Sequence, residues 1–540
     1  MRVRLSFPTP PGRASRPTTA RAPNPVLLVT AIVVVTGFTG VVPATARQAP
    51  RNVVLIIADD HRYDFFSAHP EAPPFLSTPG LDRMAKEGAH LANAFVTTAL
   101  CSPSRASILT GRYAHNHGVV DNTSPIPAGT RFFPQDMQQN GYATAYIGKW
   151  HMGESDDDPR EGFDHWVSFR GQGVYRDPVL NVDGERVERD GYITDILTGY
   201  AVDWLSDRDD DEPFLLILSH KAVHAEFEPA DRHAGEHADV EIPYPATMAL
   251  TESNQAGKPR WVREQRGSWH GVDYMFHGSM DFDEFYRRYT ETLLALDESV
   301  GRVLQHLTDV GLADETLVLY LGDNGFLLGE HGLIDKRNAY EESIRVPMLA
   351  WAPGWVQAGS RLDDLVRNID IAPTLLELAG TSTSIAVDGE SFLDLLRDAT
   401  PPSEATGEEA GEEAGEETGE EAGEETGEEA GEEALTGEEQ RREFLYEYYW
   451  EHAFPHTPTT FALRNERYKF IYYHGVWDSE ELYDMQNDPE ERSNLANVPA
   501  MLSVVDEMRA RLFDRLTEED ALRVPMRRGS WKAGERLLYD

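Results

Sequence analysis

Between about residue 50 and residue 385, the chain alternates short apolar runs with longer stretches that have helical spacing. Four of the runs carry no charge and have the length of a strand: Asn52–Ala58, Ala143–Ile147, Phe214–Leu218 and Thr316–Leu321. Strands that are buried on both faces have this pattern, and intervening helices are typical of parallel connections. The pattern predicts an α/β domain over residues 50–385, built on a large mixed, mostly parallel sheet sandwiched by helices.

The pattern changes near the C-terminus. Phe444–Tyr473 is rich in Tyr, Phe and Thr with strand-like runs, and Met501–Leu516 has the spacing of an amphipathic helix. We therefore expect residues 441–540 to form a smaller α+β subdomain built on a short antiparallel sheet.

The N-terminal segment has the order of a targeting sequence. Residues 1–46 carry five Arg and no acidic residue, and the apolar run Val26–Val42 is followed by Ala44-Thr45-Ala46. This order is typical of a secretory signal peptide. It predicts export to the periplasm or the extracellular space, with no stable membrane insertion after cleavage. A retained N-terminal membrane anchor is the alternative, because the run is almost long enough to span a bilayer.

A second unusual segment lies at residues 400–440. Residues 407–434 repeat the motif GEEA or GEET and contain fourteen Glu and no basic residue. A sequence that repels itself and has no apolar side chain larger than alanine cannot bury a core, so we expect an acidic, disordered insertion that hydrolysis does not need. Calcium buffering is the alternative role.

Charge and cysteine content exclude several classes of function. The 540 residues include 49 Lys and Arg against 93 Asp and Glu, giving a net charge of −44. A nucleic-acid backbone would be repelled, so no nucleic-acid partner is expected. The single cysteine, Cys101, excludes an intrachain disulfide framework and a cysteine-cluster metal site.

Polar side chains follow each of the four predicted strands. The clusters are Asp59-Asp60-His61, Gly148-Lys149-Trp150-His151, Ser219 to His224, and Gly322-Asp323-Asn324. Because open α/β sheets bind ligands at the carboxyl ends of their strands, we expect the clusters to share one cleft. The Asp and Asn side chains offer oxygen ligands, which suit Ca²⁺ or Mg²⁺ better than Zn²⁺. Each Asp or Asn pair taken alone is also typical of a turn or a helix cap.

Cys101 begins the segment Cys101-Ser102-Pro103-Ser104-Arg105, which leads into a helical stretch that ends at Gly111. Ser102 is a suitable N-cap, and Gly111 fits the C-terminal cap. A lone cysteine is usually an inert, buried side chain. At a helix start beside Arg105, Cys101 becomes a candidate reactive group.

In these residues the chain resembles the type I sulfatases, a branch of the alkaline-phosphatase-like superfamily. The family signature C-x-P-x-R is matched by Cys101–Arg105, and the second signature, G-Y-x-T-x-x-x-G-K-W-H-x-G, is matched by Gly141–Gly153. Asp59-Asp60, Asp323-Asn324-Gly325 and Lys336–Pro347 match as well. The resemblance covers the chain from about residue 51 to its end.

The resemblance implies that a formylglycine-generating enzyme converts Cys101 to Cα-formylglycine. One hydroxyl of the aldehyde hydrate would attack sulfur, and the other would then expel sulfate from the covalent sulfo-enzyme. The implied ligands of one Ca²⁺ ion are Asp59, Asp60, Asp323, Asn324 and the modified Cys101.

The resemblance also implies roles for the cationic residues and histidines. Arg105 and Lys149 would orient the formylglycine, His151 would act as its base, and His224 and Lys336 would hold the sulfate and protonate the leaving alkoxide. The family usually has Pro before the histidine of the sulfate site. This chain has Val223 there, so His220 remains the alternative to His224.

The substrate implied is a sulfated glycan, either a glycosaminoglycan or another polysaccharide. Tyr113–Gly118, Glu481–Asp484 and Asn494–Ala496 resemble segments of such sulfatases and would line a sugar pocket or serve as turns and strands. Tyr446–Trp450 would stack on sugar rings or pack the small sheet. Two other functions stay open: a phosphodiesterase or phosphonate hydrolase of the same superfamily, and a protein that binds sulfated glycan without turnover.

Overall fold

The computed structural model describes residues 48–153, 155–208, 212–382, 386–399, 443–451, 454–476 and 479–522. The predicted signal peptide and the glutamate repeat lie outside these residues and stay predictions. Among the described residues, no helix has both the length and the apolar character needed to cross a membrane.

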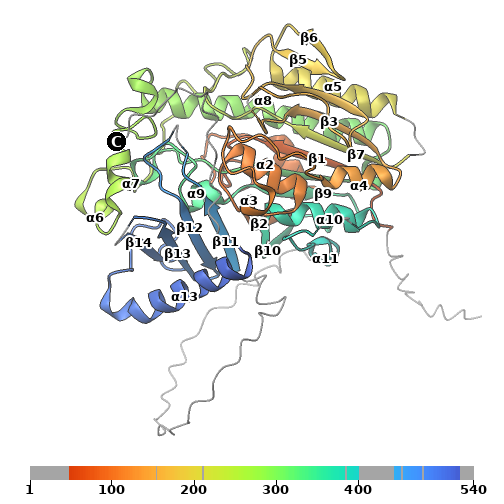
Figure 1. Cartoon of the computed structure of the whole chain (residues 1–540). Coiled ribbons are helices and arrows are strands. Elements are labelled where there is room, and N and C mark those ends of the chain that lie inside the picture. The colour runs from red at the N-terminus through yellow and green to blue at the C-terminus, as the bar shows by residue number, and fades with distance from the viewer. Residues whose placement is uncertain are drawn as a thin grey trace, which may run out of the picture. The chain divides into compact units, whose positions relative to one another are not determined.

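The larger sheet has ten strands in the order β10-β2-β9-β8-β1-β7-β3-β4-β5-β6. Its strands are β1 Asn52–Ala58, β2 Ala89–Phe95, β3 Ala143–Lys149, β4 His165–Phe169, β5 Val179–Val182, β6 Glu185–Glu188, β7 Phe214–Ser219, β8 Thr316–Gly322, β9 Met348–Trp351 and β10 Ser360–Arg367. The four predicted strands are the adjacent β8, β1, β7 and β3, which are parallel to one another (Figure 1). Antiparallel pairs join β9 to β2 and β8, and β5 to β4 and β6. The predicted mixed, mostly parallel sheet is confirmed.

Helices pack against both faces of this sheet. Val53, Leu55 and Ile57 of β1 belong to one apolar core, and Val54, Ile56 and Ala58 belong to a second, so the strand is buried on both sides. The first core includes helices α2 Cys101–Thr110, α4 Phe133–Gln139 and α10 Ile371–Leu378. The second core includes α1 Pro79–Glu87, α5 Ile193–Asp207 and α8 Phe282–Asp309. Burial on both faces explains the uninterrupted apolar sequence of the central strands.

The smaller sheet is antiparallel, with the order β11-β12-β13-β14 (Figure 1). Its strands are β11 Glu443–Tyr448, β12 Thr460–Asn465, β13 Tyr468–Tyr473 and β14 Glu480–Asp484, and α13 Leu502–Glu518 is the predicted amphipathic helix. Tyr446 and Tyr448 join the first core of the large sheet, and Leu445 packs with α13 on the opposite face. The predicted small antiparallel sheet is confirmed, and these tyrosines pack it against the main body.

Candidate active site

The ends of two adjacent parallel strands bring the acidic residues together. β1 and β8 are in register, with Ala58 opposite Gly322, so the residues that follow each strand meet at the same edge. The backbone N–H of Asp60 donates to Asp323 Oδ1 at 3.1 Å. Carboxylate oxygens of Asp59, Asp60 and Asp323 lie within 4.8 Å of one another, and all three side chains are buried. The convergence predicted from the strand ends is present in the structure.

The acidic residues form a donor set that fits a hard cation. Asn324 donates to Asp60 Oδ1 at 2.7 Å, while Asn324 Oδ1 is buried and has no hydrogen-bond partner among the described residues. Burial and the negative charge of Asp59 raise the pKa of Asp60, and they raise the pKa of Asp323 to about 6. Three crowded carboxylates and an unpartnered amide oxygen are the chemistry that Ca²⁺ or Mg²⁺ satisfies.

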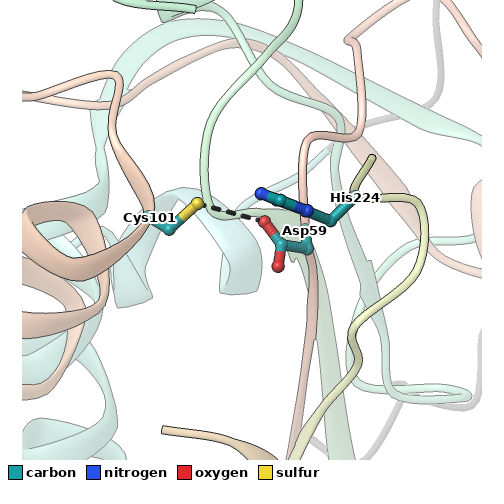
Figure 2. Close-up of side chains that lie close together, drawn as sticks. All are labelled: Asp59, Cys101 and His224. Atoms are coloured by element: carbon teal, nitrogen blue, oxygen red, sulfur yellow. Dashed lines mark hydrogen bonds between the residues drawn. The ribbon is translucent and has the colours of Figure 1, made fainter. Parts of the chain in front are cut away.

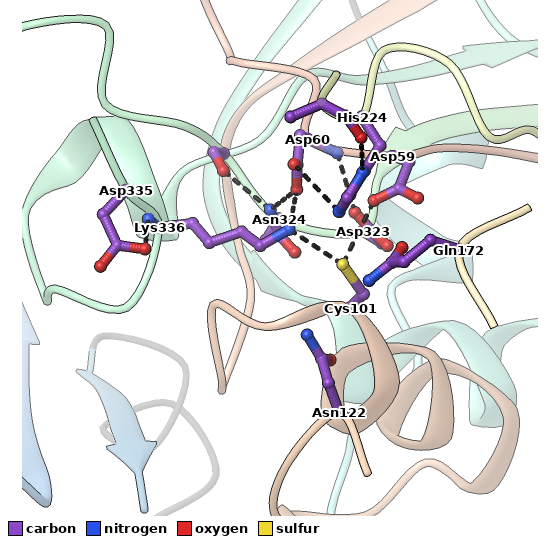
Figure 3. A network of polar contacts seen from close by, with 12 residues as sticks. Asp59, Asp60, Cys101, Asn122, Gln172, His224, Asp323, Asn324, Asp335 and Lys336 are labelled. Carbon is purple, nitrogen blue, oxygen red and sulfur yellow. Dashed lines mark hydrogen bonds and ion pairs between the residues drawn. The ribbon is translucent and has the colours of Figure 1, made fainter. Parts of the chain in front are cut away.

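Cys101 is the first residue of α2 and is fully buried. Its Sγ donates to Asp59 Oδ1 at 3.3 Å, and Lys336 Nζ donates to the Sγ at 2.9 Å (Figure 2, Figure 3). Burial, reinforced by the charge of Asp59, raises the pKa of the thiol to about 12. An unmodified Cys101 is therefore a protonated thiol at neutral pH and a poor nucleophile.

The N-terminus of α2 differs from the expectation in one detail. The N-cap is Leu100, and the predicted cap, Ser102, lies inside the first turn. Ser102 Oγ instead contacts His151, both at its backbone oxygen and at Nδ1, 3.3 Å away. Gly111 ends the helix as predicted, with a left-handed φ of 68° and its N–H donating to Ser107.

Three cationic side chains pair with the carboxylates. Arg105 donates from Nε to Asp323 Oδ2 at 2.9 Å and from Nη1 to the Lys149 backbone oxygen at 2.9 Å. Lys149 pairs with Asp59 and Gln172. Lys336 pairs with Asp60 (Figure 3). All three cations are buried. Although burial alone would raise the pKa of Asp59, the cations around it hold that pKa well below its ordinary value.

The two histidines that the sequence left as alternatives for the sulfate site, His220 and His224, have different surroundings in the structure. His224 Nε2 lies 3.9 Å from Asp60 Oδ2, and a ring nitrogen of His224 belongs to a compact group with Asp59 and Cys101 (Figure 2). His220 is buried and shares a hydrogen bond of 2.9 Å with Ser299 of α8. The pKa values of His151 and His224 fall well below 6.5, because burial and nearby lysines disfavour their charged forms.

A cavity of about 650 Å³ opens beside these residues. It is lined by Asp60, His151, His224 and Lys336, by Arg337 of the matching segment Lys336–Pro347, and by residues outside the predicted site, namely Asn122, Gln172, His270, Asp335, Glu451 and Phe454. Asp335 and Arg337 are the sequence neighbours of Lys336, which was the available signal for them. None of Tyr113–Gly118, Glu481–Asp484 or Asn494–Ala496 is among the described residues that line this cavity.

The family model described as "Sulfatase" matches residues 51–381, more than half of the chain. The chain belongs to the sulfatase family. The predicted enzyme class is thereby confirmed. A further family model, described as "N-sulphoglucosamine sulphohydrolase, C-terminal", matches residues 427–518 of this sulfatase.

Similar proteins cover most of the sulfatase. It is 30% identical over 504 residues to an N-acetylglucosamine-6-O-sulfatase of Bacteroides thetaiotaomicron, with 82% of each chain covered. It is 30% identical over 421 residues to an N-acetylglucosamine-6-sulfatase of Homo sapiens, with 73% of each chain covered. A solved structure described as a complex with its substrate D-glucosamine-2-N,6-O-disulfate superposes with a TM-score of 0.75 at 28% identity. That alignment covers 89% of this chain and 100% of the other.

Proposed function

We propose that this sulfatase removes 6-O-sulfate from glucosamine residues of a glycosaminoglycan. The observation that carries the proposal is the similarity to the structure that holds glucosamine 2-N,6-O-disulfate, which spans that whole chain. The 650 Å³ cavity supports it, because Asp335, Arg337 and Glu451 place both signs of charge beyond Lys336. Charged side chains of both signs suit the hydroxyl and amino substituents of a sugar.

We propose Cα-formylglycine at position 101 as the nucleophilic group. The burial that raises the pKa of the thiol to about 12 leaves an unmodified cysteine with almost no thiolate at neutral pH. The intact C-x-P-x-R sequence supports conversion by a formylglycine-generating enzyme. One hydroxyl of the hydrated aldehyde would attack sulfur and displace the sugar alkoxide. The second hydroxyl would then lose its proton as the aldehyde reforms and sulfate leaves.

The side chains around residue 101 can support both the attack on sulfur and the later loss of sulfate. Lys149 and Arg105 are buried cations that stabilise negative charge developing at residue 101. His151 is held in its neutral form by burial and by Lys149, so it is available as a base. His224 is neutral for the same reasons, and the negative charge of an incoming sulfate would favour its protonation. We propose Lys336 and His224 as the donors that protonate the departing sugar oxygen.

We propose that Asp59, Asp60, Asp323 and Asn324 hold one Ca²⁺ ion together with the modified residue 101. The buried, unpartnered Asn324 Oδ1 and the three converging carboxylates support this ligand set. A bound Ca²⁺ would supply a positive charge that polarises the sulfate ester.

The order of basic, apolar and small residues in segment 1–46 supports export before the protein acts.

The test is sulfate release from a defined set of sugars. Protein produced with a formylglycine-generating enzyme is incubated with glucosamine 6-O-sulfate, glucosamine 2-N-sulfate and the 2-N,6-O-disulfate, and free sulfate is measured by ion chromatography. We expect release from both 6-O-sulfated sugars and none from the 2-N-sulfate. Cys101→Ala is the matched inactive control.

Two results would overturn the proposal. Hydrolysis of aryl phosphate or phosphonate esters without hydrolysis of any sulfated sugar would favour the phosphodiesterase or phosphonate hydrolase function. Tight binding of the disulfate without turnover by the converted protein would favour a glycan-binding protein.

A further inference from the structure

A second group of potential metal ligands lies outside the active site. His331 belongs to the short turn η3 Glu330–Gly332, Glu342 belongs to α9 Glu341–Ile344, and Glu491 follows β14 of the small sheet. One ring nitrogen of His331 and one carboxylate oxygen from each glutamate lie within 4.8 Å of one another. The residues are 3%, 7% and 0% exposed. A buried cluster of one imidazole and two carboxylates therefore joins segments of the two sheets.

His331 and Glu342 have polar atoms that the protein does not satisfy, whereas Glu491 is contacted at both carboxylate oxygens, by Lys469 at 2.7 Å and by the backbone N–H of Glu341 at 2.8 Å. Both ring nitrogens of His331 are buried without a hydrogen-bond partner among the described residues, and so is Glu342 Oε2. Tyr340 packs against the His331 ring with a centroid distance of 4.1 Å, which covers the ring face and leaves its nitrogens at the edge. An unpartnered buried polar atom destabilises the folded state, so three of them in one place call for a ligand.

The charge around the cluster favours a cation. Glu342 forms no ion pair within the part of the chain that the structure describes. The surrounding network contains carboxylates on Asp64, Glu330, Glu341, Glu342, Glu481 and Glu491, and cations on Arg62, Lys258, Arg345, Arg464 and Lys469. Carboxylates outnumber cations in this buried region, and a bound metal ion would offset the repulsion among them.

The neighbouring lysines do not block such an ion. Lys469 Nζ lies 2.7 Å from Glu491 Oε1 but also 3.1 Å from Glu341 Oε1, so it keeps a partner if Glu491 turns to a metal. Lys258 donates to the Tyr483 hydroxyl at 2.7 Å and to the Glu491 backbone oxygen at 2.9 Å. Lys469 would give up its contact with Glu491 and keep the one with Glu341, and Lys258 makes neither of its hydrogen bonds to a carboxylate oxygen of the proposed ligands.

We propose that His331, Glu342 and Glu491 bind a divalent transition-metal ion, with Zn²⁺ the best match. One imidazole and two carboxylates form a mixed nitrogen and oxygen set, unlike the all-oxygen set at Asp59, Asp60 and Asp323. Ligands at about 2.1 Å from a tetrahedral ion lie about 3.4 Å apart, so small side-chain shifts from the present spacing suffice. The ion would link the segment after β8, which also carries Lys336, to the segment after β14.

The test is metal content and thermal stability of untagged, full-length protein. The protein is stripped with a chelator, incubated with ZnCl₂ or CaCl₂ alone, desalted and analysed by inductively coupled plasma mass spectrometry. We expect about one Zn²⁺ per chain in the wild type and a higher melting temperature with Zn²⁺. His331→Gln and Glu491→Gln are expected to lose at least about tenfold in Zn²⁺ affinity. His237→Gln, which changes a buried histidine outside this cluster, is the matched control and should bind Zn²⁺ like the wild type.

The results separate this site from the proposed calcium site. Asn324→Ala should lose Ca²⁺ and keep Zn²⁺, so failure of the calcium assignment leaves the zinc assignment standing. Absence of Zn²⁺ from the wild type, or equal Zn²⁺ affinity in His331→Gln, would overturn the proposal. If both glutamine variants fail to fold, X-ray absorption at the zinc edge of the wild type decides. A spectrum with one imidazole and carboxylate oxygens supports the site, and a spectrum without imidazole refutes it.

Discussion

Asp297 of α8 offers a test of how burial controls the stability of this protein. It is 2% exposed and accepts the backbone N–H groups of Gly80 at 3.0 Å and Leu81 at 2.8 Å, at the start of α1. Burial raises the pKa of its carboxyl group to about 7, although both hydrogen bonds oppose the rise. The same helix carries Tyr289, whose hydroxyl donates to the Asp60 backbone oxygen, so α8 also supports the active-site edge.

The substitution Asp297→Asn removes the titrating group, and the size of its effect on the free energy of unfolding follows from the pKa of Asp297. A carboxyl group whose folded pKa exceeds its unfolded value makes the protein most stable below the unfolded value, and this stability is lost as pH rises through the folded value. Between the ordinary value of 3.8 and about 7, the loss amounts to about 4 kcal/mol. The amide of the Asp297→Asn variant would not titrate, but its NH₂ group would face one backbone N–H and cost about 1–3 kcal/mol at every pH.

The assay compares melting temperatures of wild type and variant in buffers of constant ionic strength from pH 5 to pH 8.5. Relative to the variant, the wild type should lose about 2 kcal/mol of stability between pH 5 and pH 7, or about 2 °C for a chain of this size, and little more above pH 7. Asp309→Asn, at the exposed end of the same helix, is the matched control and should follow the wild type. A constant difference in melting temperature between wild type and Asp297→Asn at every pH would show that the Asp297 carboxyl group does not have a raised pKa in the folded protein.

Three further predictions concern the site and the small sheet. His224→Ala should lower kcat/KM by about 100-fold, whereas His220→Ala should mainly lower the melting temperature; steady-state kinetics showing the reverse would exchange their roles. Chelation should lower sulfate release and Ca²⁺ should restore it, with Asn324→Ala raising the Ca²⁺ concentration required about tenfold; full activity after chelation would contradict the metal assignment. Burial opposes charging of His115, but its hydrogen bond and ion pair with Glu447 raise its pKa above 6.5. The stability from this pair is present below pH 6.5 and is lost as pH rises through the raised value, so His115→Gln should lower the melting temperature more at pH 6 than at pH 9. An equal loss at both pH values would contradict the ion pair.

The centre of the fold could be predicted from the sequence because its strands are buried on both faces. Val53 to Ile57 alternate between two apolar cores, so the strand shows no polar position. The edge strand β6, Glu185–Glu188, has almost no apolar side chain and pairs through its backbone alone, so no sequence pattern identified it.

Part of the candidate site could also be predicted from the sequence, namely the residues that follow the central strands. Strand order places Asp59 and Asp323 side by side, because parallel strands end at one edge. The choice between His220 and His224 depends on how the chain turns after β7, and no periodicity encodes that turn. Glu451 reaches the cavity from the small sheet, about a hundred residues after Lys336, and a contact between such distant segments leaves no local signal.

The sequence also could not decide whether Tyr113–Gly118 lines a sugar pocket or has a structural role. His115 Nδ1 lies 2.7 Å from Glu447 Oε2, and its Nε2 lies 2.8 Å from the Glu519 backbone oxygen. This segment therefore ties α2 to the small sheet and α13. A polar, His-rich sequence is equally compatible with ligand binding and with such an interface, and only the fold distinguishes them.

The most direct test of the central claim is the mass of the tryptic peptide Glu87–Arg105, from protein made in cells that supply a formylglycine-generating enzyme. It contains Cys101, the single cysteine of the chain. We predict a peptide lighter by the exchange of H₂S for O, with a converted fraction that rises in proportion to sulfate release from glucosamine 6-O-sulfate across preparations. An unmodified thiol in protein that is fully active would contradict the formylglycine mechanism.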